Sequence, residues 1–223
     1  MRFQAASPDA RAIVYAGIQA DPLVARTASL LADADRGQLL LARAVMNGER
    51  TEPETWRRIF PAIFTGDAVE RSEAILAVSL AVAERGEQAR SQYRGAIVEA
   101  LTETLLGRRV PSAAVHRERR VLFDGVRSEI HPYDVTVELP GRAEVYDCKW
   151  GARGINADVL HQLDDAQSHA AAEEERLAVA LVVFDARRSC EVRAARLTAP
   201  RAKTRVFTLE SMAKLAGGPA RTP

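Results

Sequence analysis

The segment from Tyr133 to Lys149, YDVTVELPGRAEVYDCK, holds two alternating runs joined by a turn. Residues 133–139 and 143–149 each alternate apolar and polar side chains, which is the pattern of half-buried β-strands. The tripeptide Pro140-Gly141-Arg142 between them is a turn signal. The segment therefore predicts a β-hairpin, and the rest of the chain is interpreted around it.

Helical and strand patterns flank this hairpin on both sides. The predicted elements are, in order, a helix at 91–106, strands at 114–123, 133–139 and 143–149, a helix at 156–176, a fully apolar strand at 177–184, a strand at 206–209 and a short helix at 210–215. Asn156 is the expected N-cap of its helix. An order of helix, three strands, helix and strand predicts an α/β fold, with helices on both faces of a mixed sheet.

The chain is expected to have two parts and a tail. Residues 1–90 show a succession of short helical patterns, the first of which is expected to start at Ser7-Pro8-Asp9. In residues 91–216 the sequence pattern changes, and helical segments alternate with strand segments. Residues 217–223 are expected to form a flexible tail. We thus predict a helical N-terminal region followed by an α/β domain.

Composition excludes several protein classes. The chain has 223 residues, of which 47% are hydrophobic and 27% charged, and its formal net charge is +1. Its two cysteines are too few for a disulfide scaffold and are consistent with a reducing compartment. No apolar run is long enough to cross a bilayer, and the N-terminus lacks the apolar core of a secretory signal. These features predict a cytoplasmic globular protein without a membrane partner.

Arginine supplies nearly all of the positive charge. Of the 31 basic residues only three are lysines, Lys149, Lys203 and Lys214. A lysine in this chain is therefore notable, since the two cations differ chemically. The stretch from Arg187 to Arg205 holds seven basic residues and a single acid, Glu191. This stretch either lines a track for a phosphate backbone or forms a solvated face, and both interpretations stay open.

The end of the hairpin carries the candidate chemistry. Asp147 and Lys149 lie two residues apart on one strand and therefore share a face with Val145. Hairpin geometry brings Asp134, near the start of the first strand, towards Asp147. Two adjacent carboxylates repel unless a cation lies between them, and hard oxygen ligands suit Mg²⁺. With Lys149 beside the metal to orient water and stabilise charge at phosphorus, the expected chemistry is phosphodiester hydrolysis.

The motifs Gly95-Ala-Ile-Val-Glu99, Pro132-Tyr-Asp134-Val and Asp147-Cys-Lys149, in this order and on these elements, resemble the PD-(D/E)xK nuclease superfamily. The resemblance covers roughly residues 91–185. It implies a restriction-endonuclease-like core of the form αβββαβ. Tyr133 stands where many members have the proline of a Pro-Asp pair, which is a minor departure.

The resemblance also implies roles for individual residues. Glu99, Asp134 and Asp147, with the carbonyl of Cys148, would bind Mg²⁺, for which Mn²⁺ is expected to substitute. Lys149 would act as the catalytic base or as an electrostatic stabiliser. A glutamine on the helix after the motif belongs to the catalytic set in several branches of the family. The remaining implied catalytic residue is therefore Gln162.

Each assignment has a competing interpretation. Asp147 and Lys149 would otherwise form an ion pair on an exposed strand. The competitors of the other residues are Glu103 for Glu99, Asp124 and Glu129 for Asp134, and Gln167 for Gln162.

The predicted function is that of a Mg²⁺-dependent endonuclease that hydrolyses DNA, by analogy in restriction or antiphage defence. DNA is preferred to RNA on the family resemblance, and an RNase would use the same residues. The alternative from another class is a nuclease-fold subunit that binds or scaffolds a partner. A homo-oligomer, or a partner protein docked on residues 1–90, is expected.

Overall fold

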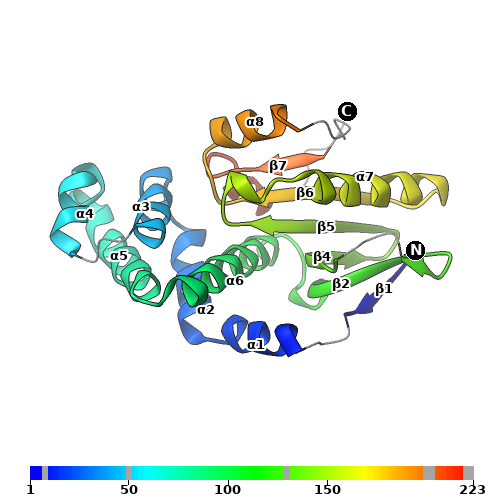
Figure 1. Ribbon diagram of the computed structural model, residues 1–223, viewed down its shortest axis with the longest axis horizontal. Helices are drawn as coiled ribbons and strands as arrows, with labels where there is room; N and C mark the ends of the chain where they lie inside the picture. The colour runs from blue at the N-terminus through cyan, green and yellow to red at the C-terminus, as the bar shows by residue number, and fades with distance from the viewer. Residues whose placement is uncertain (7–9, 49–51, 128–130, 198–203, 218–223) are drawn as a thin grey trace. The chain divides into compact units, whose positions relative to one another are not determined.

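The structure is a computed structural model, and it describes residues 1–6, 10–48, 52–127, 131–197 and 204–217. The chain divides into two compact units (Figure 1). One comprises Asp9–Thr104, and the other comprises Met1–Pro8 with Leu105–Pro223. The predicted helix start at Ser7-Pro8-Asp9 and most of the predicted tail lie outside the described residues.

The C-terminal unit is an α/β structure built on a seven-stranded mixed sheet (Figure 1). Its strands are β1 (Arg2–Ala5), β2 (Val115–Phe123), β3 (Val126–Arg127), β4 (Tyr133–Leu139), β5 (Arg142–Lys149), β6 (Leu177–Val183) and β7 (Arg205–Phe207). The spatial order is β1-β2-β4-β5-β6-β7, and β3 pairs with β2. Its helices are α7 (Ala157–Ala172) and α8 (Arg187–Ala195), with the short 3₁₀ turns η3 (Ser112–Ala114), η4 (Ala152–Gly154) and η5 (Met212–Leu215).

The predicted hairpin forms the centre of this sheet. Strands β4 and β5 pair antiparallel, with Val135 opposite Tyr146 and Leu139 opposite Arg142. Gly141 in the turn has a φ of 72°, a conformation that glycine adopts without steric cost. Strands β5 and β6 run parallel, because α7 carries the chain back along the sheet between them.

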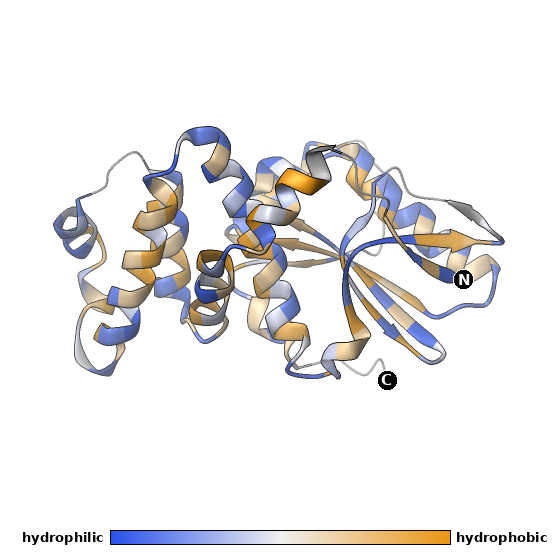
Figure 2. Ribbon diagram, turned by 90° about the horizontal axis from the view of Figure 1, so that it is seen from below, coloured by the Kyte–Doolittle hydropathy of each residue, from blue (hydrophilic) through white to orange (hydrophobic). Residues whose placement is uncertain are grey.

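One hydrophobic core lies between the sheet and α7. It contains Val145, Leu181 and Leu163, all of which are fully buried. The sequence LAVALVV of β6 is almost entirely apolar, as expected for a central strand, and Figure 2 shows the strands coloured largely as hydrophobic. The helix starts where predicted, because the Asn156 side chain accepts a hydrogen bond from the Val159 N–H at 2.9 Å.

The N-terminal unit consists of helices. They are α1 (Ala10–Gln19), α2 (Pro22–Ala32), α3 (Arg36–Asn47), α4 (Pro53–Ile59), α5 (Val69–Ala83) and α6 (Glu87–Leu106), with 3₁₀ turns η1 (Pro61–Ile63) and η2 (Gly66–Ala68). Asp35 and Gln38 form a reciprocal capping box at the start of α3. Helix α4 ends before Pro61, as the sequence predicts. Among the described residues, no helix combines the length and apolar character that a membrane span requires.

The division between the units differs from the predicted boundary after residue 90. Helix α6 begins at Glu87, and up to Thr104 it belongs to the helical unit. Side-chain contacts explain this, since the Tyr93 hydroxyl donates to the Asp21 carboxylate and Arg90 donates to the carbonyl of Gly48. The strands β1 and β3 and the helix α8 were not predicted from the sequence.

Candidate metal and phosphodiester site

Strands β4 and β5 bring Asp134 and Asp147 together, as the hairpin predicts. The Asp134 carboxylate accepts a hydrogen bond from the Cys148 N–H, with Oδ2 2.5 Å from the nitrogen. Because Cys148 directly follows Asp147 on β5, this bond fixes the Asp134 carboxylate beside the strand end that carries the motif. Hydrogen bonding to the charged form of a carboxylate stabilises that form. The Asp134 carboxylate is thus held next to the second carboxylate.

Lys149 contacts both aspartates. Its Nζ forms an ion pair with Oδ1 of Asp147 and lies 4.0 Å from Oδ2 of Asp134. The contact with Asp147 confirms that the two side chains share a face of β5. Desolvation by burial lowers the pKa of Lys149, but the attraction of Asp134 and Asp147 outweighs it, so the pKa is raised above its usual value. Lys149 is therefore an ammonium ion at neutral pH, which favours an electrostatic role over that of a neutral base.

Asp147 has the properties of a cation ligand. Its side chain is only 8% exposed. Its Oδ1 atom is buried, and its partner is the Lys149 ammonium, with which it forms an ion pair. Two neighbouring carboxylates repel unless cations compensate their charge, and Lys149 supplies only one positive charge for Asp134 and Asp147. The residues present therefore fit a divalent metal.

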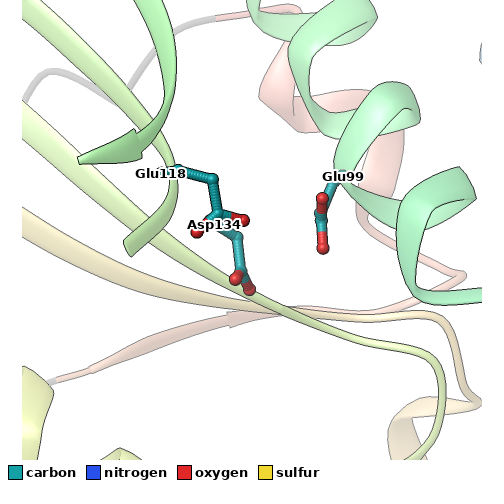
Figure 3. A group of neighbouring side chains, drawn as sticks. All are labelled: Glu99, Glu118 and Asp134. Carbon is teal, nitrogen blue, oxygen red and sulfur yellow. The ribbon is translucent and has the colours of Figure 1, made fainter. Parts of the chain in front are cut away.

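Glu118 on β2 adds an acid that the sequence did not identify. The β2–β4 register pairs Arg117 with Val135 and Arg119 with Tyr133, which leaves Glu118 opposite Asp134. Carboxylate oxygens of Glu118 and Asp134 lie within 4.8 Å of each other (Figure 3). Asp134 therefore has an acid near it on each neighbouring strand, Glu118 on β2 and Asp147 on β5.

The backbone of Glu118 is unusual. Its φ is 51°, a left-handed conformation inside a strand. Such a conformation costs about 1–3 kcal/mol for a residue other than glycine, and strained residues concentrate at functional sites. The only sequence signal for Glu118 is that it is the one acid in the run Arg117 to Arg120.

Glu99 lies in the helical unit on α6, where Figure 3 also draws it. It is buried, and its carboxylate accepts hydrogen bonds from the Tyr15 hydroxyl at 2.5 Å and from Nε2 of Gln19 at 2.7 Å. Its competitor Glu103 is half-buried. Within its own unit, the Glu99 carboxylate is therefore held in a fixed position by two donors.

Gln162 is buried on α7 and contacts backbone. Its Oε1 accepts a hydrogen bond from the His131 N–H at 3.2 Å, and its Nε2 donates to the His131 carbonyl at 3.0 Å. The sequence predicted a catalytic glutamine, but the structure uses both ends of this amide to hold the segment that leads into Asp134. These contacts position that segment, and the catalytic role of Gln162 stays a prediction. Its competitor Gln167 is half-buried on the same helix.

The alternatives to Asp134 differ in position. Asp124 is exposed in the turn between β2 and β3, with a φ of 46°. Glu129 lies outside the described residues. Cys148, whose carbonyl was predicted as a metal ligand, is buried and contributes its N–H to Asp134.

Two residues that the sequence did not single out support the end of β5. Asp185, buried after β6, accepts hydrogen bonds from the Ala152 N–H at 2.9 Å and the Ala186 N–H at 2.7 Å. Gly154 packs so closely on Lys149 that an added Cβ would lie 2.9 Å from the lysine Cβ and Cδ atoms. The loop after β5 therefore fixes the stem of Lys149.

Comparisons with known proteins give little further information. No family model matches the chain, and no curated protein matches it. A solved structure, described as the crystal structure of protein VC1899 from Vibrio cholerae, aligns with 97% of this chain at 17% sequence identity and a TM-score of 0.44. The aligned region spans 57% of that protein. A likeness of this degree carries no argument about function, so the function is inferred from the site.

Proposed function

We propose that the protein is a Mg²⁺-dependent endonuclease with a restriction-endonuclease-like core. The observation that carries the proposal is the pair of neighbouring carboxylates, Asp134 and Asp147, which a single ammonium, that of Lys149, contacts at the end of β5. The order α6, β2, β4, β5, α7, β6, apart from the small strand β3, supports the fold assignment. The competing interpretation of an exposed ion pair is disfavoured, because Asp147 is buried.

Asp134 and Asp147 would hold the metal, with Glu118 near Asp134 and the Cys148 carbonyl as a further oxygen donor. Glu99 is proposed as a further metal ligand because the sequence resembles the nuclease superfamily. When bound, Mg²⁺ would polarise a phosphoryl oxygen and lower the pKa of a coordinated water. Carboxylate and carbonyl oxygens are the donors that this hard ion prefers.

The residues of the chain supply position and charge. Lys149 stays protonated beside two aspartates and would stabilise the negative charge that develops at the attacked phosphorus. The Cys148 N–H holds Asp134, and Gln162 holds the backbone of His131 ahead of it. These hydrogen bonds keep the acids in place, which is how an enzyme avoids reorganisation during phosphoryl transfer.

DNA is the proposed substrate, and restriction or antiphage defence the proposed role, on the strength of the sequence resemblance alone. The helical N-terminal unit is the proposed docking surface for a second copy or a partner protein. An RNase would use the same residues, and a scaffold subunit would keep the fold without the reaction. Metal binding, measured together with cleavage of DNA and of RNA, separates these three functions.

The test combines metal binding with cleavage. Mn²⁺ and Mg²⁺ are titrated by calorimetry into the wild type, Asp147→Asn and the control Asp165→Asn, an exposed acid on α7. The same samples are assayed for plasmid nicking and for cleavage of a matched RNA. We expect the wild type and Asp165→Asn to bind metal and nick DNA, and Asp147→Asn to lose both properties.

Other outcomes of this experiment would favour the RNase or the scaffold subunit. Metal binding with cleavage of RNA alone would identify an RNase. An absence of metal binding in the wild type, with or without DNA, would contradict the catalytic proposal and leave the scaffold function.

A further inference from the structure

An open pocket of about 860 Å³ lies beside the end of β5. Its walls come from η4 and α8, and four arginines line it, Arg153, Arg188, Arg193 and Arg196. The remaining lining residues are small or uncharged, and no acid is among them. We call this feature the arginine pocket.

The face of α8 explains why the pocket is purely basic. Arg188, Val192 and Arg196 are spaced four residues apart and therefore lie along one stripe of the helix. Glu191, the acid of α8, lies on another stripe, where Arg187 binds it with Nε 2.8 Å from Oε1. Among the described residues, no ion pair is formed by the four pocket arginines. Their charge is available to a ligand.

The position of Arg188 is unfavourable for the helix itself. It lies in the first turn of α8, where the macrodipole disfavours positive charge and the N-terminal N–H groups attract anions. The N-cap residue is Ala186, which has no side-chain acceptor and also lines the pocket. Val192 in the same wall is 46% exposed. The first N–H groups of this segment already have carboxylate partners, since the Ala186 N–H donates to Asp185 and the Arg187 N–H donates to Glu210. The capacity of the pocket for an anion therefore rests on its arginines.

The arginine pocket is connected to the candidate site through the strand ends. The Phe184 N–H donates to the Lys149 carbonyl at 2.8 Å, which joins the ends of β5 and β6. The two loops that follow, 150–154 and 184–186, supply Ala152, Arg153 and Ala186 to the pocket. Arg193 connects α8 to the residue that follows the first of these loops, since its Nε donates to the Ile155 carbonyl at 2.8 Å. Ligands of α/β sheets bind at this edge, beyond the carboxyl ends of parallel strands.

We propose that the arginine pocket binds backbone phosphates of the nucleic-acid strand that is cut at Asp134, Asp147 and Lys149. The inference rests on the proposed function for the identity of its ligand. Guanidinium groups bind phosphate through paired N–H donors, and an open basic groove without base-reading geometry selects the backbone rather than a sequence. The pocket therefore supplies affinity and orientation, and the acids supply the reaction.

The test measures binding without cleavage. Fluorescence anisotropy of labelled duplex and single-stranded DNA is recorded in EDTA at salt concentrations from 50 to 200 mM. The variant is Arg188→Gln/Arg196→Gln. The control is Arg142→Gln/Arg176→Gln, which removes the same charge from two exposed arginines at the opposite ends of β5 and β6.

Each phosphate contact contributes about 0.9 to the slope of log K against log salt for duplex DNA. We expect the pocket variant to lower this slope by roughly 1–2 and to weaken binding at least about 10-fold at 100 mM salt. The control variant is expected to keep the wild-type slope. Equal changes in both variants, or a slope unchanged in the pocket variant, would overturn the proposal and leave a solvated arginine face.

The DNA-binding test of the arginine pocket can fail independently of the metal-binding and cleavage test of the endonuclease. Metal binding by the wild type without any DNA binding in EDTA overturns the arginine pocket while the metal site stands. DNA binding that depends on Arg188 and Arg196, in a protein that neither binds metal nor cuts, supports the pocket while the endonuclease proposal fails.

Discussion

The substitution Gly154→Ala tests how Lys149 is held in place. The alanine Cβ would lie 2.9 Å from Cβ and Cδ of Lys149 and 3.0 Å from its Cγ. Carbon atoms in contact prefer about 3.5–4.0 Å, so the overlap is roughly half an ångström or more. Because the Cβ of Lys149 is fixed to β5, either the turn η4 moves outward or the lysine stem rotates.

The magnitude follows from this overlap. Forcing an extra methyl group into a packed site costs about 1–3 kcal/mol. For a chain of this size, 1 kcal/mol corresponds to a fall in Tm of about 2–4 °C. A displacement of about 1 Å in a catalytic group can cost roughly 100-fold in rate. We expect Gly154→Ala to lower kcat at least about 10-fold, with KM and metal affinity changed less than about 3-fold.

Two further measurements make the result specific to Lys149. The chain has only three lysines, so side-chain NMR of ¹³C,¹⁵N-labelled lysine gives a simple spectrum, with the Lys149 signal assigned from Lys149→Arg. That signal is expected to shift in Gly154→Ala. The control is Gly151→Ala in the same loop, where an added Cβ would make an ordinary contact, 3.6 Å from Asp185 Oδ2. Wild-type cleavage with an unshifted Lys149 signal in Gly154→Ala would refute the reasoning.

Three other variants test separate parts of the structure. Gln162→Leu leaves the backbone groups of His131 without their partners, so we expect a loss of about 1–3 kcal/mol in urea unfolding and weaker metal binding; unchanged metal affinity would show that the amide does not position Asp134. Glu118→Gly relieves the positive φ that Glu118→Ala retains, so the glycine variant should be the more stable of the two by about 1 kcal/mol, and equal stabilities would contradict the strain. The third variant concerns pH. Burial raises the pKa of Glu144, but its hydrogen bonds with Arg109 and Tyr146 outweigh burial, so the folded pKa lies below the unfolded value. The stabilisation is therefore present above an unfolded pKa of about 4.3 and is lost as the pH falls through the folded pKa. Glu144→Gln should cost about 3–5 kcal/mol at pH 7 and progressively less in acid, whereas a difference independent of pH would contradict the ionic role.

Much of the sheet could be predicted, because local patterns specify it. The alternation in residues 133–149 and the apolar run of β6 identify strands, and Asn156 identifies a helix start. Helix α8 was missed because its sequence, RRSCEVRAA, has no apolar stripe, and one buried residue, Cys190, anchors it in the core. Strand β1 has four residues and depends on pairing with β2 far along the chain.

The candidate site was predicted where a hairpin determines it and missed where distant segments do. The proximity of Asp134 and Asp147 follows from the turn between them. Glu118 joins them only through the register of β2 on β4 and a positive φ, neither of which local sequence shows. Gln162 meets the backbone of His131, 31 residues earlier, and backbone partners leave no trace in side-chain patterns.

The most direct test of the account is a calorimetric titration of Mn²⁺ into the wild type and Asp134→Asn. Loss of one carboxylate from a cluster of oxygen ligands weakens attraction for a divalent cation, while Lys149 remains beside Asp147. We predict saturable binding by the wild type and binding at least about 10-fold weaker by the variant. Equal affinities in the two proteins, or no saturable heat in the wild type, would contradict a metal site at the end of β5.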